Sequence, residues 1–98
     1  MNIQVYNSAK VQLDKLLKDE SSKKYIRIFI RTISFWCDAR VHLTLDELQK
    51  DDQLFEADGY NIIMNKRLAT QINNVYISFG GLLSPNEFSV DCDFNEYY

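Results

Sequence analysis

The sequence has little of what small secreted and membrane proteins require. Its 98 residues include two cysteines, one proline, three glycines and one histidine. Two cysteines are too few for a disulfide framework, so Cys37 and Cys92 are expected to be reduced thiols. No apolar run approaches the roughly 20 residues that cross a bilayer, and residues 1–10 contain no apolar signal segment. We therefore expect a cytoplasmic protein with no membrane span.

Positive charge is scarce in the second half of the chain. Residues 1–45 carry eight Lys and Arg against four Asp and Glu, whereas residues 46–98 carry three against ten. The formal net charge of −3 has the wrong sign for non-specific nucleic-acid binding. The sequence also has no glycine-rich phosphate loop, which argues against a nucleotide enzyme.

The hydrophobic content of 46% is that of one ordinary globular domain, here residues 1–98. Asn7 or Ser8 is expected to cap a helix over about 8–19, in which Asp14 pairs with Lys18 one turn on. The inward stripe of this helix is expected to hold four residues, namely Ala9, Leu13, Leu16 and Leu17.

The rest of the chain alternates with the period of β-strands. Apolar residues recur at every second position in 25–32 and 40–45, and Asp58-Gly59 between two apolar runs is a strong signal for a tight hairpin. Further segments complete the pattern: a strand at 1–6, a short helix at 66–72, and strands at 75–79 and 88–94. The fold class is therefore α+β and β-rich, with the first helix against a sheet or small barrel.

The order of these elements resembles the HesB-like, or A-type, family of iron–sulfur cluster biosynthesis proteins. The resemblance implies a mixed β-sandwich or pseudo-barrel with an N-terminal helix and one short second helix. It also implies a non-enzymatic accessory protein, a scaffold or carrier whose partners donate or accept clusters. The stretches that carry the resemblance are Asn2–Val5, Ser8–Lys10, Tyr25–Arg31, Leu43–Glu47, Asp51–Asp52, Asp58–Gly59 and Asn65–Ile72.

In that family three cysteines hold the metal: one after the first long strand and a Cys-Gly-Cys near the C-terminus. Cys37 stands near the first of these positions, and the resemblance makes it the first candidate to bind iron. The Cys-Gly-Cys is absent, and Cys92, on the last expected strand, is the second candidate. A [2Fe–2S] cluster takes four ligands, so a full thiolate set needs a homodimer. Iron, a [2Fe–2S] cluster and no cofactor at all are left open.

Other residues give weaker signals for a site. His42 is the only histidine, and its position in the alternation places it away from the apolar side of its strand. Tyr25, Arg27, Phe29 and Arg31 interleave rings and cations, which is typical of a single-strand nucleic-acid platform or of a second, half-buried sheet face. An acidic run is expected to be a solvated edge or a surface for a partner: Asp46, Glu47, Asp51, Asp52, Glu56 and Asp58.

Two functions follow, and neither is an enzyme, since no set of catalytic residues converges in the sequence. The first is the accessory protein of cluster assembly, with Cys37 and then Cys92 as the cofactor-binding residues. The alternative is a HesB-like fold that has no metal and acts as a protein-interaction module.

Overall fold

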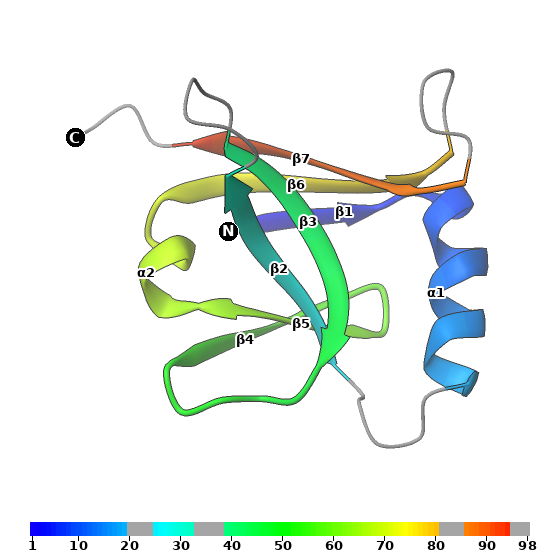
Figure 1. Ribbon diagram of the computed structural model, residues 1–98, viewed down its shortest axis with the longest axis horizontal. Coiled ribbons are helices and arrows are strands. Elements are labelled where there is room, and N and C mark those ends of the chain that lie inside the picture. The colour runs from blue at the N-terminus through cyan, green and yellow to red at the C-terminus, as the bar shows by residue number, and fades with distance from the viewer. Residues whose placement is uncertain (20–24, 33–38, 81–85, 95–98) are drawn as a thin grey trace.

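The computed structural model describes residues 1–19, 25–32, 39–80 and 86–94, which form seven strands and two helices (Figure 1). A three-stranded sheet has the strand order β1-β6-β7, and a four-stranded sheet has the order β3-β2-β5-β4. In chain order the elements are β1 (Asn2–Val5), α1 (Asn7–Asp19), β2 (Tyr25–Thr32), β3 (Ala39–Asp46), β4 (Asp52–Ala57), β5 (Tyr60–Asn65), α2 (Lys66–Ala69), β6 (Ile72–Phe79) and β7 (Phe88–Phe94).

Two hairpins of neighbouring segments build the four-stranded sheet. β2 and β3 pair antiparallel along their whole lengths, with Tyr25 opposite Asp46. β4 and β5 are joined by Asp58 and Gly59, whose φ angles of 52° and 86° are both positive. Those angles match the right-handed twist of the strands on either side, which is why the Asp-Gly pair forms the turn.

The two hairpins meet in a short parallel ladder between β2 and β5. This ladder contains only two pairs, Ile26 with Ile62 and Arg27 with Ile63. β2 then continues to Thr32 beside β3, whereas β5 ends at Asn65 and the chain enters α2. Beyond Arg27 the two strands therefore separate, as Figure 1 shows.

The three-stranded sheet joins segments far apart in the chain. β1 pairs parallel with β6, from Asn2 opposite Asn74 to Val5 opposite Ile77, and β7 pairs antiparallel on the other side of β6. α1 packs against β6. The hydroxyl of Ser8 accepts a hydrogen bond from the backbone N–H of Phe79 at 3.1 Å, which ties the start of α1 to the end of β6.

The core lies between these elements and is wholly apolar among the described residues. β5 is the most deeply buried strand, since Ile62, Ile63 and Met64 are all inaccessible to solvent. Its place between β2 and β4 buries residues on both of its faces. The largest fully buried side chains are Leu13, Ile26, Ile28, Ile62, Ile63, Met64, Val75 and Ile77.

The β-rich α+β class, the N-terminal helix and the short second helix are confirmed. The second helix is shorter than the expected 66–72, because it ends at Ala69 and Ile72 instead begins β6 as a core residue. Leu16 is 37% exposed, against the expectation that it faces inward. Ala9, Leu13 and Leu17 follow one another at four-residue spacing along the buried stripe, which leaves Leu16 at its margin.

Two expected polar contacts of α1 are replaced by contacts with the sheets. Neither Asn7 nor Ser8 caps the helix, because the helix begins at Asn7 and both residues lie in its first turn, where the Ser8 hydroxyl accepts the Phe79 N–H. Asp14 accepts a hydrogen bond from the hydroxyl of Tyr60 at 2.6 Å in place of the expected pair with Lys18. Tyr60 is buried, so its hydroxyl requires a partner, whereas the exposed Lys18 is satisfied by water. Within the described ranges, neither helix is long and apolar enough to cross a membrane.

Candidate functional site

Of the two cysteines, only Cys92 lies in the part of the chain that the structure describes. Cys37 lies outside the described residues, in the segment between Thr32 at the end of β2 and Ala39 at the start of β3. Cys92 is on β7, opposite Val75 of β6, and its half-buried side chain packs against the core. β3 and β7 are in contact, so the strand that begins two residues after Cys37 lies against the strand that carries Cys92.

The thiol of Cys92 is held in its protonated form. Burial raises its pKa, and the neighbouring carboxylates of Asp91 and Asp93 raise it further, to about 11. A thiol ligates metal as the thiolate, so a metal ion at Cys92 has to displace a tightly held proton. No group of three or more His, Cys, Asp or Glu side chains suited to a metal ion occurs in the part of the chain that the structure describes.

His42 lies on the side of β3 that the sequence predicted, away from the core residues Val41 and Leu43. It is half-buried on β3 opposite Phe29 of β2, and the two rings stack with their centroids 5.8 Å apart. Its Nε2 atom is buried and has no hydrogen-bond partner among the described residues. The prediction that His42 faces away from the apolar side of its strand is confirmed, and the face it shares with Phe29 is half-buried.

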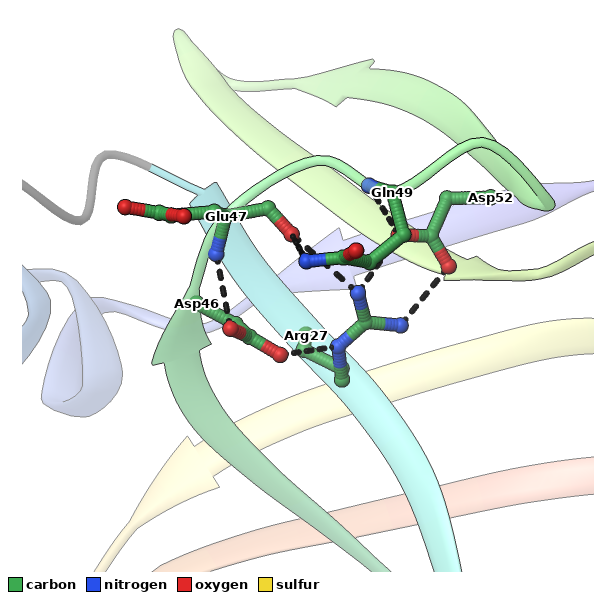
Figure 2. A network of polar contacts seen from close by, with 5 residues as sticks. All are labelled: Arg27, Asp46, Glu47, Gln49 and Asp52. Carbon is green, nitrogen blue, oxygen red and sulfur yellow. Dashed lines mark hydrogen bonds and ion pairs between the residues drawn. The ribbon is translucent and has the colours of Figure 1, made fainter.

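The most organised polar cluster surrounds Arg27 (Figure 2). Its Nε donates to Asp46 at 2.6 Å, and its two terminal nitrogens bind both carboxylate oxygens of Asp52, Nη1 at 2.7 Å. The second terminal nitrogen also donates to the carbonyl of Glu47 at 3.3 Å. Asp52 in turn accepts the backbone N–H of Gln49 at 2.7 Å. These contacts join β2 to the end of β3, the start of β4 and the turn between them.

The electrostatics of this cluster indicate a structural role. Hydrogen bonds with Asp52 raise the pKa of Arg27 above its already high ordinary value, and the same bonds lower the pKa of Asp52. The Asp52 side chain is only 3% exposed and that of Arg27 is 16% exposed. Four of its five N–H donors are engaged, three by carboxylates and one by the Glu47 carbonyl, so Arg27 has little to offer to a phosphate group. Arg27 is therefore not available as the central cation of a nucleic-acid platform on this strand face.

The sequence interpretation missed this cluster and treated the acidic run as surface. Asp46 and Asp52 belong to that run, yet they turn inward onto Arg27. The strand register gives one signal for the cluster. Arg27 lies opposite Thr44, so Asp46, two residues after Thr44, lies on the same face of the sheet as Arg27. That relation depends on the strand register, which alternation alone does not give. Of the candidate residues that are described, Arg27 meets Asp46 and Asp52, and His42 stacks on Phe29, whereas Cys92 is on another strand, β7.

Comparison with known proteins locates the fold. No family model and no curated protein sequence matches the chain. Among solved structures, SufA of Escherichia coli, which is involved in biosynthesis of iron–sulfur clusters, gives a TM-score of 0.73 at 17% identity, over 94% of this chain and 86% of that chain. IscA with a [2Fe–2S] cluster gives a TM-score of 0.67 at 20% identity, over 92% of this chain and 84% of that chain. The fold expected from the sequence resemblance is thereby confirmed.

Proposed function

We propose that the protein is a non-enzymatic accessory protein of iron–sulfur cluster assembly that carries iron or a [2Fe–2S] cluster as cargo. Cys37 is the principal ligand and Cys92 the second, with both contributed by each chain of a homodimer. The proposed partners are proteins that donate clusters to it or accept clusters from it. The observation that carries the proposal is the likeness in fold, over almost the whole chain, to two proteins of cluster biosynthesis.

The chemistry of the two thiols supports this assignment of roles. Iron in clusters prefers thiolate ligands, and two chains with two cysteines each supply the four that a [2Fe–2S] unit takes. The contact between β3 and β7 favours a common site for the two cysteines. Because Cys92 holds its proton tightly, iron has to compete with that proton, which lowers the apparent affinity of Cys92 for iron near neutral pH and suits a carrier that has to release its cargo.

Anaerobic reconstitution with iron and sulfide tests the proposal. The wild-type protein should acquire visible absorbance and bind iron and sulfide in equal amounts. Cys37→Ser should lose most of the bound iron, and Cys92→Ser should lose less. His42→Gln removes the only imidazole and serves as the control, since it leaves both thiols in place. A colourless wild-type protein, with no iron retained after desalting, would contradict the proposal.

The alternative function is a protein-interaction module of the same fold that binds no metal. The small number of cysteines and the high pKa of Cys92 favour it. The same reconstitution separates the two candidates. The module predicts a folded wild-type protein that stays free of iron, and identical behaviour of the Cys37→Ser variant in every binding assay with a partner.

A further inference from the structure

An open groove runs between β2 and α2. It has a volume of about 250 Å³ and is lined by Arg27, Ile28, Phe29, Ile30, Asn65, Arg67, Leu68 and Gln71. Four of these residues are consecutive in β2, and consecutive side chains of a strand point to opposite faces of its sheet. A single groove can be lined by all four only along the edge of the strand. The groove therefore follows the backbone edge of β2.

That edge has no strand partner among the described residues. The ladder with β5 ends at Arg27, while 28–32 continue beside β3 on the other edge. No backbone hydrogen bond joins 28–32 to α2 in the described part of the chain. Within 28–32, every second residue directs its N–H and C=O toward the open edge. Unpaired groups of this kind bind an added strand.

The size of the groove selects the kind of ligand. Pockets for drug-sized molecules usually occupy about 300–1,000 Å³ and enclose most of the ligand, whereas this groove is smaller and open along one side. Its dimensions suit a few residues of an extended peptide. Leu68, half-buried on α2, supplies an apolar wall for one side chain of such a peptide.

The charged side chains beside the groove indicate which kind of peptide it would bind. Residues 46–98 hold only three basic residues, and two of them are Lys66 and Arg67 on α2. Both are exposed, and no described side chain forms an ion pair with the guanidinium of Arg67. Arg27, which also lines the groove, is already neutralised by Asp46 and Asp52. Among the described residues that line the groove, Arg67 of α2 is thus the cation without an ion pair.

We propose that the open edge of β2 binds an extended segment of a partner protein as an added strand, and that this segment alternates apolar with acidic residues. The apolar side chains face Leu68 and the acidic ones pair with Arg67, while the peptide backbone bonds to that of 28–32. The binding does not involve either cysteine, so this inference stands apart from the proposed function.

A fluorophore-labelled hexapeptide of alternating valine and glutamate is the probe. Titrated into the ¹⁵N-labelled full chain, it should shift the amide signals of 28–32 and of α2, with the remaining signals unchanged. A matched peptide with lysine for glutamate should bind at least tenfold more weakly. A third peptide carries methyl groups on alternate backbone nitrogens along one edge. Its affinity should fall roughly tenfold or more when that edge faces β2, because the methylated nitrogens cannot donate the hydrogen bonds of the ladder.

Variants of the protein provide the second arm of the experiment. Arg67→Glu should weaken binding of the glutamate peptide roughly tenfold, because it reverses the charge at the rim of the groove. Lys15→Glu makes the same change of charge on α1, at the opposite side of the molecule from α2 in Figure 1, and should change the affinity less than twofold. Dispersed amide spectra of both variants establish that each is folded.

Three results would overturn the proposal. The first is peptide-induced shifts that map away from 28–32 and α2. The second is equal affinity for the methylated peptides and their parent. The third is a set of shifts at 28–32 that depend on protein concentration without any peptide, since this would show that a second copy of the chain occupies the groove.

Discussion

Carboxylates stabilise a neighbouring charged side chain in one sheet and disfavour the charged form of a neighbouring side chain in the other. In the four-stranded sheet, Asp46 and Asp52 surround the guanidinium of Arg27, and the pKa of Asp52 is lowered by the hydrogen bonds they share. In the three-stranded sheet, Asp91 and Asp93 flank the thiol of Cys92, and they add to the effect of burial in raising its pKa to about 11. The first arrangement pairs opposite charges, whereas the second would bring like charges together if the thiol ionised.

This difference separates a structural cluster from a candidate ligand. The Arg27 cluster is complete, because each group has a partner of opposite charge and little capacity remains for a ligand. Cys92 is a single half-buried thiol whose burial and neighbouring carboxylates raise its pKa, and none of the described residues completes a metal-ligating group around it. The more conspicuous polar cluster, around Arg27, is thus a structural one.

The largest expected effect is that of Arg27→Met on stability. The substitution leaves the Asp52 carboxylate buried without its cation, so the free energy of unfolding should fall by about 3 kcal/mol in urea titrations. Adding Asp52→Asn to this variant should restore part of the loss, because it removes the uncompensated charge. Lys10→Met is the control: its pair with Asp58 is 3.7 Å long and exposed, so its loss should cost less than about 0.5 kcal/mol. Equal losses in Arg27→Met and Lys10→Met would refute the structural role.

The next effect is on the alkylation rate of Cys92, measured with iodoacetamide at pH 8 in a Cys37→Ser background. A rise in pKa from the ordinary 9.0 to about 11 reduces the thiolate fraction about 100-fold, and the greater nucleophilicity of a more basic thiolate recovers part of this. The net rate should be about tenfold below that of a peptide thiol, and it should keep rising with pH up to about 11. Replacing Asp91 and Asp93 with Asn should raise the rate only in part, since burial is the larger cause. A rate equal to that of the peptide would contradict the assignment.

The smallest expected effect is a difference in stability confined to acid. Because Arg27 lowers the pKa of Asp52 below its ordinary 3.8, the unfolded chain takes up a proton before the folded one does. The stabilisation is therefore complete above the ordinary pKa and is lost as pH falls through the lower, folded-state value. Thermal melts between pH 6 and pH 2 should show this loss in the wild type. In Arg27→Met that part of the pH dependence should disappear, and a curve parallel to the wild type would disprove the link.

Local signals predicted most of the fold. The alternation of isoleucine with other residues in 25–32 predicts β2, and Asp58-Gly59 predicts the hairpin of β4 and β5, because each depends only on neighbours in the chain. The position of β7 follows in the same way from Phe88, Val90 and Cys92. The wrong expectations for Ser8 and Asp14 have a common cause. Each side chain is satisfied by a group more than 40 positions away in the sequence, which no local pattern contains.

The candidate site was harder to predict than the fold for the same reason. The Arg27 cluster depends on the register between β2 and β3 and on a turn that brings Asp52 back to β2. The groove depends on where the ladder of β2 with β5 stops, which is set by how the strands diverge in three dimensions. The thiols could be identified from their residue type alone, but the high pKa of Cys92 required knowledge of its burial.

The parallel pairing of β1 with β6 has a consequence during synthesis on the ribosome. All four strands of the larger sheet lie within residues 25–65, so that sheet can form while the chain is still being made. β1 emerges first, yet its partner in 74–77 is made roughly 4 to 14 seconds later at ordinary rates of translation. Until 74–77 have been made, β1 therefore lacks the partner strand that it has in the folded sheet.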